Sequence, residues 1–258
     1  MLTIILFFIF LFGLAIGSFT SVIITRSHGK KPGLLWGRSE CPHCQQQLKV
    51  QHLIPLLSYF WQQGKCAYCQ KKIASIYPLL ELTTGLTFVF LFLKFPFLTE
   101  ATFSTAVLAD FSLYAFYFST LIAIAFSDVL FMEISPYLLL SAAIAAVLIA
   151  VLDYRLLTIN TLWSLIIALA LFGTQILVSR GKWLGIGDFY LALTFAIALP
   201  LPLFGINIII SYCLGALFAI LLLVNKKASI QSKIPFTPFL ILGTVLSTLL
   251  SNQLFFLF

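Results

Sequence analysis

The sequence predicts an all-α polytopic membrane protein with about eight transmembrane helices and a small cysteine-containing loop domain. Of its 258 residues, 61% are apolar and only 9% are charged, whereas about a quarter of a soluble domain is charged. The charge is also concentrated, because residues 25–75 contain eight Lys or Arg residues and a single acid, Glu40. The composition excludes a soluble globular domain, and its high hydrophobicity excludes a disordered chain.

Eight apolar stretches approach the roughly 20 residues that a helix needs to cross the hydrocarbon layer. They are residues 2–24, 77–97, 101–127, 134–152, 159–178, 189–199, 205–224 and 235–258. We interpret the first as an uncleaved span, because it lacks a basic amino-terminal region and basic residues follow it. The sixth stretch is short and ends at Pro200 and Pro202, which is typical of a half-helix or of a tilted span. The chain therefore divides into a first helix (1–24), a basic insert (25–76) and a multi-helix core (77–258).

The basic residues predict the orientation, because cytoplasmic loops carry an excess of Lys and Arg. With the N-terminus outside, 13 of the 15 basic residues fall in cytoplasmic segments. These segments are residues 25–76, 128–133, 179–188 and 225–234. Basic residues beside a span bind anionic lipid headgroups, and the insert has no Arg-rich run interleaved with aromatic residues, as a base-stacking surface would have. We therefore expect the insert in the cytoplasm, in contact with the lipid bilayer and not with nucleic acid.

The basic insert contains two Cys-x-x-Cys pairs, Cys41 with Cys44 and Cys66 with Cys69. Two such pairs at this separation are typical of a four-thiolate zinc site, in which the ion is structural because no coordination position stays open. Nearby basic residues favour the thiolate form, and a reducing cytoplasm disfavours disulfides. A redox-active dithiol and a segment without metal are the alternatives.

Acidic residues at membrane depth are uncommon and mark functional sites. Asp128 ends the third stretch and Asp188 begins the sixth, so both are expected at the same depth on the cytoplasmic side. Two carboxylates held a few ångströms apart share one proton. Such a pair activates water for attack on a peptide carbonyl and protonates the leaving amine. The alternative is that each aspartate only caps a helix.

Three further residues are candidates for a supporting role at the active site. Gly185 and Gly187 precede Asp188 in a Gly-x-Gly-Asp sequence. There we expect them to allow torsions closed to other residues, and to leave room for a substrate strand. Glu81 lies about one turn into the second stretch, where it would either line the active site or pair with a base such as Lys71.

These residues together resemble the type IV prepilin peptidase family, the Gly-x-Gly-Asp aspartic membrane proteases of bacteria. The matching motifs are Gly17-Ser18-Phe19, Cys41-Pro-His-Cys44, Ile54-Pro-Leu-Leu-Ser58, Cys66-Ala-Tyr-Cys69, Tyr77-Pro-Leu-Leu-Glu81-Leu, Asp128, Gly185-Ile-Gly187-Asp188 and Ile234-Pro-Phe-Thr-Pro-Phe239. The Gly-x-Gly-Asp motif alone is weak. The ordered set, with paired Cys-x-x-Cys motifs between the first two spans, is specific and extends over nearly the whole chain.

The resemblance implies an aspartic endopeptidase of the bacterial cell membrane. In that family the enzyme removes the short basic leader of prepilins and pseudopilins, whose N-terminal helix is apolar, at the cytoplasmic face. The cut falls after a glycine, and the new N-terminal amine, usually of Phe, is then methylated from S-adenosylmethionine. Carried over by motif, Asp128 and Asp188 are the catalytic residues, and the four cysteines bind zinc.

Three positions depart from the family pattern. An Ile-Pro pair usually follows the first aspartate, but here a serine separates the two residues in Glu133-Ile-Ser-Pro136. Tyr190 stands where the family usually has a lysine, and Ser21 stands where it commonly has an asparagine. Neither catalytic aspartate is altered, so the departures indicate a divergent branch, such as the competence-pseudopilin peptidases of Gram-positive bacteria. Two functions from other classes are the alternatives: a transporter or channel whose carboxylates carry protons or cations, and a scaffold whose cysteine insert recruits a cytoplasmic partner.

Overall fold

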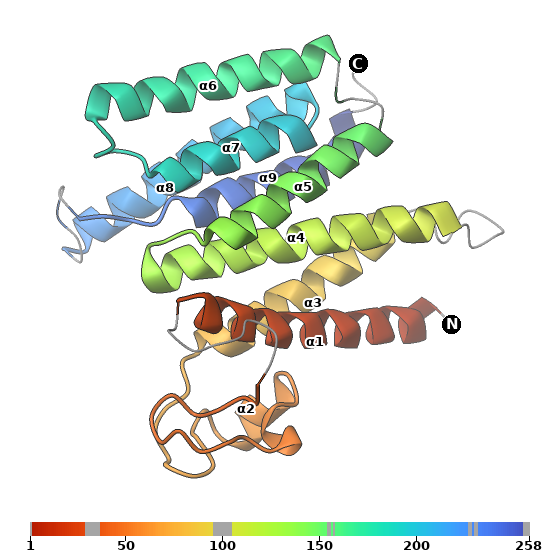
Figure 1. Cartoon of the computed structure of the whole chain (residues 1–258), viewed down its shortest axis with the longest axis vertical. Helices are drawn as coiled ribbons and strands as arrows, with labels where there is room; N and C mark the ends of the chain where they lie inside the picture. The colour runs from red at the N-terminus through yellow and green to blue at the C-terminus, as the bar shows by residue number, and fades with distance from the viewer. Residues whose placement is uncertain are drawn as a thin grey trace. The chain divides into compact units, whose positions relative to one another are not determined.

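The computed structural model describes residues 2–28, 37–94, 105–153, 156, 158–226, 229 and 232–254. It divides into two compact units, Met1–Phe126 and Ser127–Phe258, which we treat separately. Its α-helices, labelled in Figure 1, are α1 (Leu2–His28), α2 (Leu57–Trp61), α3 (Ile76–Lys94), α4 (Thr105–Phe131), α5 (Pro136–Leu152), α6 (Ile159–Ser179), α7 (Ile186–Ala198), α8 (Leu201–Val224) and α9 (Thr237–Leu254). A short 3₁₀ helix, η1 (Val50–His52), lies between α1 and α2.

Eight of these helices coincide with the eight apolar stretches, which confirms the all-α class. Five of them, α1, α3, α4, α6 and α8, are long and apolar enough to cross a membrane. The chain is therefore a multi-pass membrane protein. Helices α5, α7 and α9 are apolar but shorter, so eight membrane crossings stay a prediction, as does the three-part division of the chain. Residues 29–36 of the basic insert, and 95–97, 101–104 and 255–258 of the predicted spans, lie outside the described residues.

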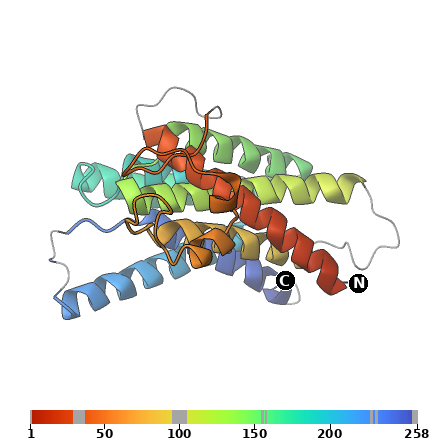
Figure 2. The same ribbon diagram turned by 90° about the horizontal axis from the view of Figure 1, so that it is seen from below.

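In the first unit, α1 and α3 pack against each other and cross (Figure 2). Glycines permit the close approach. A Cβ atom on Gly13 would lie 2.8 Å from the Cα of Gly85, and one on Gly17 would lie 2.8 Å from the Cα of Glu81. Both distances are too short for a side chain, so the two backbones touch through small residues, as is common between membrane helices.

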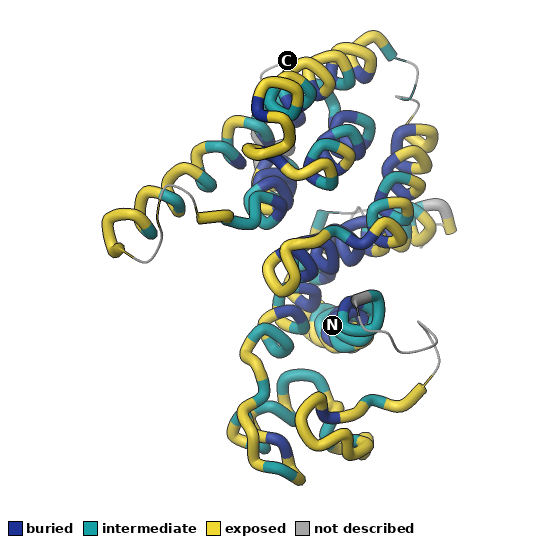
Figure 3. Tube along the Cα trace, turned by 60° about the vertical axis from the view of Figure 1, so that its left-hand side comes forward, coloured by how far each residue is buried: buried dark blue, intermediate teal, exposed yellow. Residues whose placement is uncertain are grey.

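Residues 25–28 of the basic insert belong to α1, and its described residues 37–75, between α1 and α3, contain little regular structure. It is closed by two isolated bridges, Glu40 with Gln47 and Lys65 with Lys72, and it contains the short elements η1 and α2. Most of the segment is exposed (Figure 3), and its buried residues are Cys41 and Cys66. A segment this small, with almost no apolar core, needs a cross-link or a metal for stability.

In the second unit, α7 is the central helix, since it contacts α5, α6, α8 and α9. Its residues Leu191, Ala192, Phe195 and Ala196 are at most 1% exposed. A helix that other helices surround on all sides is apolar all round, which explains why the sixth stretch is apolar yet short. The helix begins at Ile186, three residues before the predicted start, so that Asp188 lies within its first turn.

Candidate active site and metal centre

The structure brings the four predicted metal ligands together. The Sγ atoms of Cys41, Cys44, Cys66 and Cys69 all lie within 4.8 Å of one another, and those of Cys41 and Cys69 are 3.8 Å apart. Thiolates on a tetrahedral zinc ion, with Zn–S distances of about 2.3 Å, are separated by about 3.8 Å. The cluster therefore fits a zinc ion with four protein ligands.

The two Cys-x-x-Cys pairs adopt the same turn. The backbone N–H of Gln45 donates to the carbonyl of Cys41 at 2.8 Å, and that of Gln70 donates to Cys66 at 2.9 Å. Both glutamines have a φ of 57°, in the left-handed region. Two copies of one turn therefore face their thiols toward a shared point, which is the arrangement that a single tetrahedral ion requires.

The thiols of the cluster influence one another's ionisation. Burial raises the pKa of Cys41, but hydrogen bonds from the backbone of Cys44 and His43 and from neighbouring thiols lower it, and the balance is about 7. The backbone of Gln46 lowers the pKa of Cys44, but desolvation and the thiols of Cys41 and Cys69 raise it to about 11. Adjacent thiolates repel each other, so all four ionise together only when a cation shares their charge. This too favours a metal site.

Asp128 and Asp188 meet at Thr237, a residue for which the sequence alone predicts no role at the site. The Oγ of Thr237 donates a hydrogen bond of 2.7 Å to Oδ1 of Asp188. The side chain and backbone of Thr237 also form hydrogen bonds with Asp128, and the two carboxylates interact electrostatically. Asp128 is 8% exposed, Asp188 9% and Thr237 0%. Among the described residues, Oδ2 of Asp128 is buried without a hydrogen-bond partner.

The capping alternative accounts for one of the two aspartates. Asp188 lies in the first turn of α7 and forms a hydrogen bond with the backbone of Gly185, the N-cap residue, where a carboxylate stabilises a helix. Asp128 lies in the last turn of α4, which continues to Phe131. There a carboxylate opposes the helix dipole, at a cost of about 0.3–1 kcal/mol. Helix capping therefore does not explain why an aspartate occupies position 128.

Gly185 and Gly187 are required for space and not for unusual torsions. A Cβ atom on Gly187 would lie 2.9 Å from Cδ1 of Ile134, and one on Gly185 would lie 3.2 Å from Oδ2 of Asp188. Gly185 has a φ of −71°, and Gly187 is not among the glycines with positive φ. The expectation of special torsions is therefore wrong. Gly187 lets the start of α7 approach the α4–α5 loop, and Gly185 leaves room beside the Asp188 carboxylate.

Glu81 belongs to the first unit, where it binds the insert. Its Oε2 accepts a hydrogen bond of 2.8 Å from the backbone N–H of Leu56, and the Ser18 side chain forms another with the same carboxylate. Leu56 has φ 59° and ψ −52°, and the N–H of Leu57 donates to the carbonyl of Pro55 at 2.6 Å. This is a rare, strained γ-turn. The partner of Glu81 is thus a backbone amide and not Lys71, and a role at the aspartates stays a prediction.

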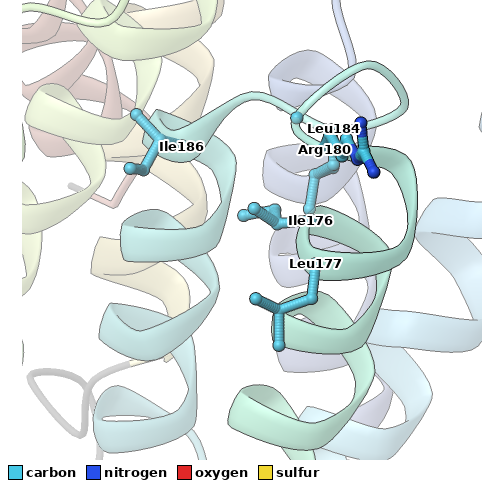
Figure 4. Close-up of a pocket in the computed structure, with 6 residues that line it drawn as sticks. Ile176, Leu177, Arg180, Leu184 and Ile186 are labelled. Atoms are coloured by element: carbon cyan, nitrogen blue, oxygen red, sulfur yellow. The ribbon is translucent and has the colours of Figure 1, made fainter.

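The second unit contains two cavities. One, of about 600 Å³, lies between α6 and α7 (Figure 4) and is lined by Ile176, Leu177, Arg180, Gly181, Leu184 and Ile186. Residues two positions apart face roughly opposite sides of a helix, so Ile186 and this cavity lie on the side of α7 away from Asp188. The other cavity is a groove of about 290 Å³ between α8 and residues 234–239, the segment that contains Thr237. Its lining contains neither aspartate, although Tyr212, one of the lining residues, interacts electrostatically with Asp188.

Comparisons with known proteins identify two matching family models. The bacterial peptidase A24 N-terminal domain matches residues 11–95, and the type IV leader peptidase family matches residues 115–220. The first range contains the four cysteines and Glu81, and the second contains Asp128 and Asp188. Thr237 lies beyond both ranges.

Several curated proteins are similar to the chain. The prepilin leader peptidase/N-methyltransferase of Bacillus subtilis (strain 168) is 29% identical, over 95% of this chain and 94% of that protein. The protein of the same name from Aeromonas salmonicida (strain A449) is 28% identical, over 90% and 86%. The type 4 prepilin-like proteins leader peptide-processing enzyme of Escherichia coli O78:H11 is 42% identical, but over only 33% of this chain and 38% of that protein.

No solved structure matches the chain significantly. The two family models nevertheless cover most of the sequence, in the order that the motifs predict. Relatives from Bacillus subtilis and Aeromonas salmonicida align along nearly its whole length. The chain therefore belongs to the type IV leader peptidase family.

Proposed function

We propose that this chain is a membrane aspartic endopeptidase that cleaves the leader from type IV prepilins or pseudopilins. The observation that carries the proposal is the convergence of Asp128 and Asp188 on one buried hydroxyl, that of Thr237, with an oxygen of Asp128 left unpartnered among the described residues. The names of the relatives supply the substrate class, since they are prepilin leader peptidases.

The proposed mechanism uses the two carboxylates as a pair with one proton between them. A hydroxyl has one proton and two lone pairs, so Thr237 can donate to the ionised carboxylate and accept from the protonated one. The ionised carboxylate takes a proton from water, whose oxygen attacks the scissile carbonyl carbon. The protonated carboxyl then gives its proton to the amide nitrogen, and the C–N bond breaks. The pair again holds one proton, and the products are a carboxylate and an amine.

In this proposal Thr237 is a positioning residue, and its hydroxyl is testable separately from its shape. Replacing Thr237 by Val keeps the volume and removes the hydrogen bond to Asp188. A hydrogen bond to a charged group contributes about 1.5–3 kcal/mol, so we expect kcat to fall roughly 10- to 100-fold with little change in KM. Thr237→Ser, which keeps the hydroxyl, should recover most of the rate. Equal kcat values for Thr237→Val and the unchanged enzyme would remove Thr237 from the mechanism.

The proposed orientation has the N-terminus outside and the insert and both aspartates on the cytoplasmic side. It rests on the distribution of Lys and Arg. The net charge of +7 is then an anchor against anionic lipid and not an attraction for the substrate, because the leader is itself basic. The apolar helix of the substrate stays in the bilayer while its leader reaches the aspartates.

The four cysteines are proposed to hold a structural zinc ion, which would cross-link residues 37–75. With four thiolates as ligands the ion has no position for water or substrate, so no step of the peptide cleavage passes through it. Its contribution is to fold a segment that buries almost no apolar surface.

Methylation of the new N-terminus is proposed from the names of the relatives. S-adenosylmethionine would supply the electrophilic methyl group. The candidate Glu81 has its carboxylate engaged with the Leu56 amide and the Ser18 side chain. These contacts give Glu81 a structural role in the first unit, and no residue is assigned to the methyl transfer.

The decisive experiment incubates the purified chain in detergent with a prepilin and reads the products by mass. We expect a single cut that releases the leader, and the mass of one added methyl group only when S-adenosylmethionine is present. A transporter or a scaffold would leave the prepilin intact, so absence of cleavage would refute the peptidase. The family models and relatives give no support to the transporter alternative.

A further inference from the structure

Helix α2 of the insert turns an apolar face outward. Leu57, Phe60 and Trp61 are three and four residues apart, so their side chains share one face of the helix. They are 59%, 71% and 77% exposed, respectively. Tyr59 is only partly exposed, and a Cβ atom on Gly64 would lie 3.1 Å from its ring. Tyr59 therefore packs on the insert, whereas the α2 face, defined as Leu57, Phe60 and Trp61, points away from it.

The hydrogen bond between Leu56 and Glu81 indicates how deep α2 lies in the bilayer. To cross a hydrocarbon layer of about 30 Å, α3 has to use its whole length of 19 residues, which is about 28 Å. This places Ile76, its first residue, at the boundary of the layer. Glu81, five residues further along, is then about 7 Å inside. Because Glu81 binds the N–H of Leu56, the residue before α2, the short helix begins close to this depth.

The length of α2 keeps its apolar face near the same boundary. The helix has five residues and is about 7 Å long, so its far end reaches toward water about as far as the level of Ile76. Figures 1 and 2 agree with this depth, because in both views the insert lies largely alongside α1 and not beyond its end. The α2 face is therefore placed between the hydrocarbon and the headgroups, the zone in which tryptophan is enriched.

The charge around the α2 face complements an anionic lipid surface. Residues 37–75 contain five Lys or Arg residues and one acid, Glu40. Lys49 directly precedes η1, which contacts α2, and Lys65 follows α2 by four residues; both lysines are exposed. An apolar face that contains Trp and Phe, with basic residues beside it, is typical of a segment that lies in the membrane interface. Anionic headgroups attract such basic residues.

We propose that the α2 face is a lipid-docking surface, whose three apolar side chains insert into the interface of an anionic bilayer beside α1 and α3. This adds to the anchoring of the insert by charge, because inserted apolar side chains hold it at a fixed depth even where salt screens the lysines. The proposal does not depend on the cleavage of a prepilin, and its test requires no catalysis.

The test measures the surroundings of Trp61 in the full chain, reconstituted in vesicles of equal amounts of phosphatidylcholine and phosphatidylglycerol. Trp36, Trp163 and Trp183 are replaced by Phe, so that all tryptophan fluorescence comes from Trp61. We expect lipids brominated on their acyl chains to quench most of this fluorescence and acrylamide in the water to quench little of it. Both results should persist at high salt. If the triple variant does not fold, the difference between the unchanged chain and Trp61→Phe provides the same signal.

Gln46→Trp, combined with Trp61→Phe in the triple variant, is the matched control within the insert. Gln46 lies between Gln45 and Gln47, and all three are polar and exposed. A fluorophore at this position should lie in water, so acrylamide should quench it and brominated lipid should not. Equal quenching of both fluorophores by brominated lipid would refute a docking surface specific to α2.

Other results would overturn the proposal and identify what covers the α2 face instead. Quenching of Trp61 by acrylamide and not by brominated lipid would place α2 in water. Protection of Trp61 from both quenchers would show that another part of the chain covers the face. Quenching by acrylamide that disappears when a prepilin is added to the Asp188→Asn form of the chain would show that the face binds the substrate and not lipid.

Discussion

Asp128→Asn and Asp188→Asn should each abolish leader cleavage while the protein still accumulates at its normal level. Asn keeps the shape of the side chain but can neither accept the proton of a water nor return one to the leaving amine. General acid–base catalysis contributes about 10²–10⁴-fold, and both functions depend on the shared proton. We therefore expect kcat/KM on a prepilin to fall by about 10³-fold or more in either variant.

The chain offers a matched control for this result on the same helix. Asp110 also lies on α4, 18 residues before Asp128, which is about 27 Å along the helix axis. Asp110→Asn removes the same charge from the same helix but far from the pair, so its kcat/KM should stay within about twofold of the unchanged enzyme. Full processing by Asp128→Asn or Asp188→Asn would show that the pair is not catalytic.

Replacing one cysteine ligand should remove the zinc ion and unfold the insert, which is the second-largest expected effect. Binding of a structural zinc ion provides about 10–16 kcal/mol in small metal-dependent segments, far more than the buried surface of residues 37–75 can offer. We expect metal analysis to find about one zinc per chain, and Cys41→Ser and Cys66→Ser to lose most of it. The insert should then become sensitive to proteases while α1 and α3 remain intact.

Cys213 provides the control, because it is an exposed cysteine on α8, outside the cluster. Cys213→Ser should keep the full zinc content. Zinc binding should also weaken as the pH falls, because thiols must lose their protons to bind the ion, and it should weaken more steeply below about 7, the pKa of Cys41. A purified chain with no metal and two disulfides in the insert would support the redox alternative.

The features that could be predicted from the sequence are those with a local signal. The apolar stretches located eight helices, and the spacing of Cys41, Cys44, Cys66 and Cys69 was enough to predict their convergence. Helix ends were less predictable, because a count of apolar residues ignores N-terminal positions occupied by glycine and aspartate. For this reason the start of α7 was placed three residues late.

The features that could not be predicted depend on contacts between distant residues. Thr237 is 49 residues from Asp188, and Leu56 is 25 residues from Glu81. A threonine before a proline at a helix start indicates an N-cap, which is all that Thr237-Pro238 indicates locally. Its position between two carboxylates follows only once α4, α7 and α9 are packed.

The hydrogen bond from Leu56 to Glu81 couples the insert to the pair of helices α1 and α3. Glu81 lies five residues into α3, and Ser18 of α1 binds the same carboxylate, so three segments of the chain meet at one charge. A half-buried carboxylate that loses its donors is costly in apolar surroundings. A change that removes the Leu56 or the Ser18 donor would therefore destabilise the contact among α1, α3 and the insert at one point.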